Sequence, residues 1–159
     1  MRNLARIVVM ALAAAVLAAC GTASRQQEPT RPLKGHFDKA TLVGHTTVLV
    51  FWASWCEFCE ANVRRIDAIE RRLPASSGLR FAGITVDSNR AAAQAFADRV
   101  NLRFDNFLDG EDEARRDKVG SLTTVLVVDA GGHVARRYTR FADGDMARLE
   151  ADLQALAGS

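Results

Sequence analysis

The amino-acid sequence predicts an α/β fold, a central mixed β-sheet flanked by helices on both faces. Two observations predict it. Short β-branched and aromatic runs alternate with amphipathic helical patterns over most of the chain, which favours strands joined by helices. Near the end, a hairpin and a last helix follow, which adds antiparallel pairing. With 159 residues, 48% of them apolar and 25% charged, the chain suits one domain with a full core.

The first residues have the features of an export signal. Two arginines flank the start of an apolar run, residues 7–19, that is too short for a comfortable membrane span. The run ends in Leu17-Ala18-Ala19-Cys20-Gly21, which resembles the bacterial lipoprotein processing box, where cleavage precedes a cysteine that then carries lipid. We therefore expect a signal peptide at 1–19 and lipidation of Cys20. The alternatives are a retained anchor helix and an unmodified Cys20 thiol.

This processing would divide the chain and change its charge. Residues 20–36 are mostly polar, so we expect a lipidated flexible tether there and a domain at 37–159. Removing residues 1–19 takes two arginines from 21 basic side chains and leaves 19, which equals the 19 acidic ones. A neutral chain argues against a nucleic-acid partner, which needs a clustered basic face. We expect a protein of the bacterial periplasm, anchored to a membrane through its lipid.

Each element of the domain has its own pattern. The run Thr47–Trp52 is continuous, β-branched and aromatic, as in a strand buried on both faces. Apolar residues at spacings of three and four from Val63 to Leu73 then predict a helix that Pro74 ends. The remaining patterns predict strands at Leu79–Val86, Asp105–Leu108 and Thr124–Val128, helices at Arg90–Val100 and Glu111–Lys118, a turn at Ala130–Gly132, an alternating strand at Val134–Thr139, and a last helix with a stripe from Met146 to Leu156.

Cys56 and Cys59 lie where the first strand meets the first helix. A structural disulfide is one interpretation, but so small a ring constrains the unfolded chain very little. A redox-active pair fits better. We place Cys56 in the first turn of the helix, where the helix dipole favours the thiolate that attacks a disulfide. Cys59, one turn further in, would resolve the mixed disulfide.

The neighbours of the two cysteines should tune and shape the site. Glu57 places negative charge beside the Cys56 sulfur, which disfavours its thiolate and predicts a reductant rather than an oxidant. Trp52 belongs to the strand, so we expect it in the core. Trp55 adjoins the nucleophile in a strand-to-helix loop, so we expect a partly exposed indole that contributes to partner docking.

The segment from Trp52 to Cys59, Trp-Ala-Ser-Trp-Cys-Glu-Phe-Cys, resembles the active-site segment of thioredoxin-like proteins. From about Leu42 onward, the order of elements resembles the membrane-tethered branch typified by TlpA, ResA and CcmG. This resemblance implies a thioredoxin-like fold and a periplasmic thiol-disulfide oxidoreductase. It also implies protein disulfides as substrates and a membrane electron donor of thiol-disulfide type as the source of electrons.

The sequence departs from that family at several positions. Thr123 stands where the family has a cis-proline, so the resemblance implies that Thr123 lies against the dithiol and that the Leu122 backbone pairs with substrate. The sequence leaves open whether the bond between them is cis or trans. Phe58 replaces a proline between the cysteines. Val50 replaces the acid buried under the motif in thioredoxin, and Asp87 is either a substitute for it or a loop-capping carboxylate.

No metal or cofactor is expected. The histidines, His36, His45 and His133, are scattered, and two cysteines alone do not make a four-coordinate zinc site. Glu60 rather than histidine follows Cys59, which excludes attachment of a c-type haem. The main alternative to an enzyme is a binding module of the same fold, with weak or no redox turnover because Thr123 replaces the proline.

Overall fold

The structure is a computed structural model that describes residues 30–35, 37–108, 110–141 and 144–157. Its centre is a five-stranded sheet in the order β3-β2-β1-β4-β5. The strands are β1 (Thr47–Trp52), β2 (Arg80–Thr85), β3 (Asp105–Leu108), β4 (Thr124–Val128) and β5 (Val134–Thr139), and the helices are α2 (Cys59–Arg72), α3 (Arg90–Val100), α4 (Gly110–Arg116) and α5 (Asp145–Ala157). Two short 3-10 turns, η2 (Lys39–Leu42) and η3 (Ala75–Ser77), complete the order.

The central strand, β1, is parallel to β2 and antiparallel to β4. All six of its residues are buried, as its β-branched and aromatic composition predicts for a strand covered on both faces. At its midpoint Val50 lies between Gly83 of β2 and Val125 of β4. The sheet is therefore mixed. Because β1 is its middle strand, the loop after β1 leaves from the middle of the sheet.

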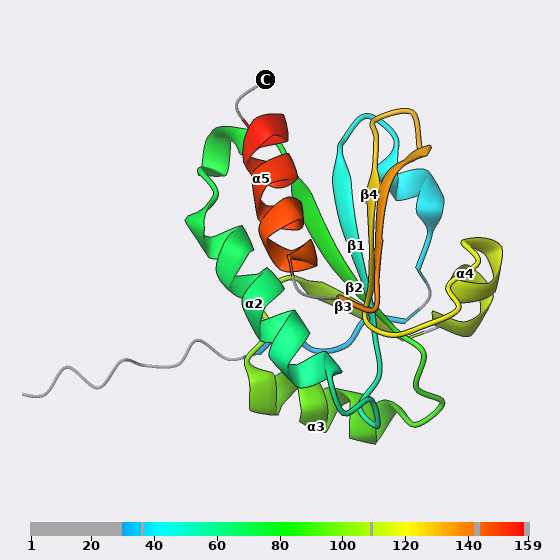
Figure 1. Ribbon diagram of the computed structural model, residues 1–159. Helices are drawn as coiled ribbons and strands as arrows, with labels where there is room; N and C mark the ends of the chain where they lie inside the picture. Colours follow the sequence, from blue (N-terminus) through cyan, green and yellow to red (C-terminus); the bar gives the residue numbers. More distant parts are fainter. Residues whose placement is uncertain (1–29, 36, 109, 142–143, 158–159) are drawn as a thin grey trace, which may run out of the picture.

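Two apolar clusters cover the two faces of the sheet. On one face, α2, α3 and α5 pack over alternate β1 residues, among them Val50 and Trp52 (Figure 1). On the other face, α4 and the segment around η2 pack over the intervening residues, such as Leu49 and Phe51. Side chains of a strand point alternately to its two faces, which is why one buried run serves both clusters.

Most sequence-predicted elements are confirmed, several to the residue. α3, β3, β4 and β5 have the predicted bounds, and α2 ends at Arg72, so that Leu73 separates its last residue from Pro74. The α/β fold with helices on both faces is therefore confirmed. β5 differs in one respect, because only Tyr138 of its six residues is buried and no alternation appears. It is an edge strand, so neighbouring residues such as Arg136 and Arg137 both reach solvent.

The folded part of the chain begins before the predicted domain boundary at residue 37. Leu33 is buried in the cluster under α3, and its backbone N–H donates to Gln94 Oε1 at 2.7 Å. Lys34 forms a parallel bridge with Phe107 of β3. The apolar Leu33 explains this, because it fills a position in the core that a polar tether residue could not.

The predicted signal peptide at 1–19, Cys20 and His36 lie outside the described residues, so those predictions stay predictions. Within the described ranges, no helix combines the length and the apolar character that a membrane span requires.

Candidate active site

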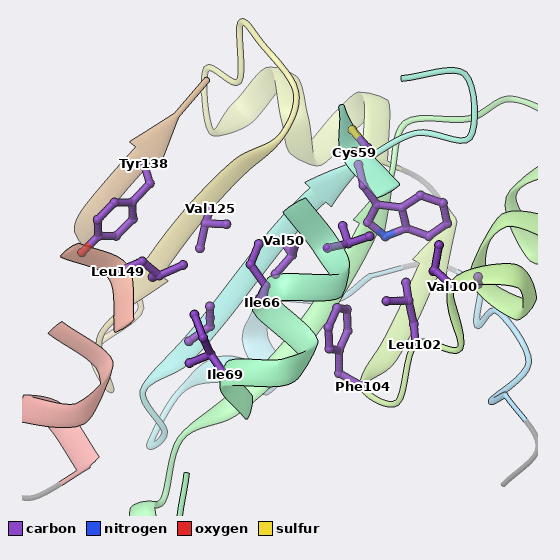
Figure 2. Packing of buried hydrophobic residues seen from close by; sticks show 14 of the residues in the cluster. Val50, Cys59, Ile66, Ile69, Val100, Leu102, Phe104, Val125, Tyr138 and Leu149 are labelled. Carbon is purple, nitrogen blue, oxygen red and sulfur yellow. The ribbon is translucent and has the colours of Figure 1, made fainter. Parts of the chain in front are cut away.

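The two cysteines lie at the carboxyl end of β1, where α2 begins. Cys56 and Cys59 form a disulfide with their Cα atoms 5.3 Å apart. Cys56 is partly exposed, whereas Cys59 is fully buried in the cluster under α2. Figure 2 shows Cys59 at the end of that cluster, above Val50 and Ile66. One sulfur is therefore open to a partner and the other is shielded.

The start of α2 corrects the sequence-based placement of Cys56. We expected Cys56 in the first helical turn, but the helix begins at Cys59. The Cys59 N–H donates to the Cys56 carbonyl at 3.1 Å, and the Cys56 N–H donates to the Ala53 carbonyl at 3.3 Å. These bonds span three residues rather than four, so successive turns precede the helix. Cys56 thus lies just outside the N-terminus of α2, and Cys59 is its first residue.

The loop that carries Cys56 is held by a buried carboxylate. Asp87, just beyond β2, accepts hydrogen bonds from the Ser54 N–H at 2.8 Å and the Ser54 hydroxyl at 2.7 Å. The Thr85 hydroxyl also donates to Asp87, at 2.6 Å. Of the two sequence-based interpretations of Asp87, these contacts support the loop-capping carboxylate.

Trp52 belongs to the core, as predicted. Its indole stacks on Phe96 of α3 with ring centroids 4.8 Å apart, and its Nε1–H donates to Asn106 Oδ1 at 3.1 Å. Asn106 is itself buried and donates to the Phe104 carbonyl at 2.7 Å. Gly83 lies beneath this pair, so close that a Cβ atom there would be 1.9 Å from Asn106 Oδ1. The end of β1 is thereby fixed in position.

An apolar cavity of about 750 Å³ opens beside Cys56. Trp55 and Phe58 line it although each is 70% exposed, and Glu57, between Cys56 and Phe58 in the chain, is also exposed. The opposite wall comes from α4 and the loop that precedes β4, with Ala114, Val119 and Leu122. A volume of this size suits a small ligand or a few side chains of a larger partner.

The wall formed by α4 is anchored by buried charge. Glu113 is completely buried and accepts from Arg116 at 2.6 Å, while Lys39 of η2 donates to Asp117 at 2.6 Å. The Lys39 ammonium also lies 3.4 Å from Glu113. These contacts tie α4 to η2 and leave Ala114 facing the cavity.

Thr123 touches the dithiol directly. The Leu122–Thr123 peptide bond is cis, which answers a question that the sequence left open. The buried Thr123 hydroxyl donates to Cys59 Sγ at 3.4 Å and accepts from Asn62 Nδ2 at 3.3 Å. Asn62 is a site residue that the sequence analysis missed, because nothing in its spacing connects it with Thr123. Leu122 lines the cavity, and Val50 is an apolar part of the core.

Charges near the start of α2 are paired. Glu60 accepts from Arg64 at 2.9 Å and from Arg99 of α3 at 3.2 Å. These hydrogen bonds, first from Arg64 and then from Arg99, hold the pKa of Glu60 below its ordinary value. Among the described residues, no three His, Cys, Asp or Glu side chains gather in a way that would hold a metal ion.

The AhpC/TSA family model matches residues 30–151 of the chain. The soluble secreted antigen MPT53 of Mycobacterium tuberculosis is 36% identical over 75 residues, which are 47% of this chain and 42% of that protein. The thiol-disulfide oxidoreductase ResA of Geobacillus kaustophilus is 27% identical over 109 residues, 67% of this chain and 62% of ResA. The matches thus span less than two thirds of each of these relatives.

Solved structures share the fold. A putative thiol:disulfide interchange protein DsbE from Chlorobium tepidum superimposes with a TM-score of 0.68 at 23% identity, over 75% of this chain and 84% of that one. A secreted Mycobacterium tuberculosis disulfide oxidoreductase homologous to DsbE has a TM-score of 0.61 at 28% identity, over 75% and 87%. The thioredoxin-like fold expected from the sequence is confirmed.

Proposed function

Because the chain belongs to the AhpC/TSA family, we propose that its dithiol performs thiol-disulfide exchange on protein disulfides, with Cys56 as the nucleophile and Cys59 as the resolving thiol. The observation that carries this proposal is the difference in burial within one disulfide. Cys56 is partly exposed beside an apolar cavity, whereas Cys59 is fully buried. Only the exposed sulfur is accessible to a second protein. The names of ResA and of the DsbE-like structures support the same chemistry.

The exchange proceeds in two steps. The Cys56 thiolate attacks one sulfur of a substrate disulfide, a Cys56–substrate bond forms, and the other substrate sulfur leaves as a thiolate that takes a proton from water. Cys59 then loses its proton to water and attacks Cys56 Sγ. The Cys56–Cys59 disulfide forms, the second substrate sulfur leaves and is protonated, and two electrons have passed to the substrate. A membrane dithiol donor would return the pair to its reduced state.

The cavity beside Cys56 is the proposed docking site for the substrate chain. Trp55 and Phe58 offer exposed aromatic surface at its rim, of the kind that dominates protein contacts. Leu122, at its wall, lies in the loop that carries Thr123 against the dithiol. We therefore assign Trp55, Leu122 and Thr123 to substrate binding, with Glu57 and Phe58 tuning the pair.

The direction of electron flow that we propose is reduction of the substrate. Glu57 is exposed next to Cys56, and its negative charge disfavours the Cys56 thiolate. A less stable thiolate makes the reduced pair a better electron donor.

The proposed location is the periplasm, with a lipid on Cys20. Its support is the leader sequence and the processing box, together with the word "secreted" in the name of MPT53. Growth with a labelled fatty acid tests it: the wild-type chain should take up label and fractionate with membranes, whereas Cys20→Ala should do neither. Equal labelling of both chains would contradict lipidation at Cys20.

The reduction potential of the Cys56–Cys59 pair tests the enzymatic proposal. We would equilibrate the purified chain, in a Cys20→Ser background, against glutathione or dithiothreitol, with Cys59→Ser as the control that cannot form the disulfide. A potential near or below about −230 mV supports a reductant, and one near about −120 mV makes the protein an oxidant. A pair that does not turn over any protein disulfide would point to a binding module.

A further inference from the structure

The Thr123 hydroxyl is hydrogen-bonded to the buried sulfur, and its surroundings fix which way it points. Its oxygen lies 3.4 Å from Cys59 Sγ and 3.3 Å from Asn62 Nδ2. An amide NH₂ group can only donate, so Asn62 uses the acceptor capacity of the hydroxyl oxygen. The single hydroxyl hydrogen is then directed to the sulfur. Thr123 and Asn62 therefore form a short relay of hydrogen bonds, from α2 through the loop before β4 back to the start of α2.

Cys59 is the first residue of α2, so the helix dipole favours its thiolate, but its apolar surroundings and the neighbouring acids oppose it, and a hydrogen-bond donor would offset them. Cys59 is buried in the apolar cluster that also contains Val50, Trp52, Val63 and Val125, and apolar surroundings disfavour a thiolate. Val50 carries no carboxylate that could take the thiol proton. The acidic residues nearest in sequence, Glu57 and Glu60, disfavour a second negative charge.

Polar groups on the other elements around Cys59 are already occupied. The carboxylate of Asp87 is bound to Ser54 and Thr85, and the guanidinium groups of Arg64 and Arg99 are bound to Glu60. On β4, the Thr124 hydroxyl donates to the Ser121 carbonyl at 2.6 Å. Within the described residues, the hydrogen bond to Cys59 Sγ comes from the Thr123 hydroxyl.

We propose that Thr123 is a catalytic residue of the resolving step, in which its hydroxyl stabilises the Cys59 thiolate, and that Asn62 is the positioning residue that aims the hydroxyl. This inference rests on the proposed function. In that step Cys59 loses its proton to water and its thiolate attacks Cys56 Sγ. The Cys56–Cys59 bond forms, the substrate sulfur leaves with the electron pair of the broken bond, and a proton from water completes the substrate thiol. Hydrogen bonds to charged acceptors are stronger than those to neutral ones, so the bond strengthens as the thiolate forms.

The first test measures the pKa of Cys59 directly. In the full-length chain with Cys20→Ser and Cys56→Ser, Cys59 is the one remaining thiol, and its thiolate is followed by ultraviolet absorbance. Adding Thr123→Val, which keeps the branched shape and removes the hydroxyl, should raise the Cys59 pKa by about one unit. Thr123→Ser should restore it. Thr124→Val, which removes the neighbouring hydroxyl bound to Ser121, should leave it unchanged.

The second test measures turnover of a protein disulfide across pH. With both active-site cysteines present, Thr123→Val should slow the resolving step about tenfold and prolong the life of the mixed disulfide, and Thr123→Ser should reverse this. Asn62→Leu should change both the rate and the Cys59 pKa in the same direction by a smaller factor. Because Asn62 is only partly buried, this variant keeps the test available if Thr123→Val does not fold.

The outcomes separate this inference from the proposed function. If neither Thr123→Val nor Asn62→Leu changes the Cys59 pKa, the inference is overturned, even if the wild type turns over normally. A wild-type chain that turns over no disulfide overturns the proposed function, and the pKa comparison still decides whether Thr123 stabilises the thiolate.

Discussion

Ser54 donates both its backbone N–H and its hydroxyl to the carboxylate of Asp87, at 2.8 and 2.7 Å. The contact joins the loop after β1 to the residue two positions beyond the end of β2, across neighbouring parallel strands. Trp55 and Cys56, which both line the cavity, follow Ser54 directly in the chain. The geometry of the dithiol loop therefore depends on a side chain that is not part of the motif.

Replacing Asp87 by alanine should destabilise the protein. The change leaves the Ser54 N–H and the hydroxyls of Ser54 and Thr85 without their acceptor, and we expect the free energy of unfolding to fall by about 2 to 3 kcal/mol. Urea denaturation measures it. Asp112→Ala, which removes an exposed carboxylate paired with Arg115, is the control and should change it by less than about 0.5 kcal/mol. Equal effects of the two substitutions would contradict the role of Asp87.

Gly83 should not tolerate a methyl group. An alanine Cβ there would lie 1.9 Å from Asn106 Oδ1 and 2.8 Å from Trp52 Nε1, and Asn106 is held by its bond to the Phe104 carbonyl. We expect Gly83→Ala to lower the free energy of unfolding by about 1 to 3 kcal/mol and to perturb Trp52 fluorescence. Gly35→Ala is the matched control, because a Cβ at Gly35 meets nothing within 4 Å. A neutral Gly83→Ala would mean that Trp52 and Asn106 can move apart.

Reversing the charge of Glu57 should make the dithiol more oxidising. A lysine beside Cys56 favours its thiolate and hence the reduced pair, so we expect Glu57→Lys to raise the reduction potential by on the order of 10 to 30 mV. The same charge change in Glu150→Lys, at a residue bound to Arg72 near the other end of α2, should shift the potential much less because salt screens it. A shift toward more negative potential in Glu57→Lys would reject the proposed tuning.

Trp55 and Phe58 should matter for protein substrates and little for folding. Both are largely exposed at the cavity, so we expect the double substitution to alanine to leave the free energy of unfolding within about 0.5 kcal/mol of wild type. The kcat/KM for a protein disulfide should fall about tenfold, while that for a small disulfide such as oxidised glutathione, which depends only on the tuning by Phe58, should change much less. Val43→Ala, at another exposed apolar residue, should alter neither. Equal loss on both substrates would instead indicate damage to the dithiol.

Glu70 should make the protein less stable as pH rises. Burial, and then the charge of Asp67, raise the pKa of Glu70 to about 7 from an ordinary value of 4.5. The folded protein therefore binds more protons than the unfolded chain between these values, and its stability falls as pH rises through them. Above pH 7 we expect Glu70→Gln to be more stable than wild type by about 1 kcal/mol, since partial exposure of Glu70 weakens the effect.

Urea denaturation at several pH values checks this sign, and Glu60→Gln supplies a control of opposite sign. Glu60 has a lowered pKa, so its contribution to stability is present above pH 4.5 and is lost as pH falls through its folded-state pKa. Glu60→Gln should therefore be less stable than wild type at neutral pH and converge with it in acid. A stability difference between Glu70→Gln and wild type that does not change between pH 4.5 and 7 would reject the assignment.

The sequence predicted the fold well because each apolar pattern is typical of one kind of element, either a strand or a helix. The buried run Thr47–Trp52 and the amphipathic repeat of Arg90–Val100 are strong local signals, and both elements appear with those bounds. The exposed β5 was placed correctly but its alternation was not, because an edge strand lacks the second covering layer that would enforce alternation.

Contacts between distant segments were harder to predict. Nothing local connects Asn62 with Thr123, 61 residues further on. The helix start was misplaced by three residues because Glu57 and Phe58 suit a turn as well as a helix, and helix boundaries depend on hydrogen bonds that sequence patterns do not encode. Leu33 escaped notice as a single apolar residue in a polar stretch, although it enters the core under α3.

The short bridge between Lys34 and Phe107 also affects how molecules of this protein meet one another. Lys34 donates to the Asn106 carbonyl at 2.8 Å and accepts from the Leu108 N–H at 3.2 Å, so it covers part of the outer edge of β3. At the opposite edge, β5 presents Arg136 and Arg137 to solvent. An open strand edge invites pairing with another chain, and a covering segment or charged side chains discourage it. The sheet is thus protected against edge-to-edge aggregation by backbone on one side and by charge on the other, which would matter most for chains crowded together on a membrane surface.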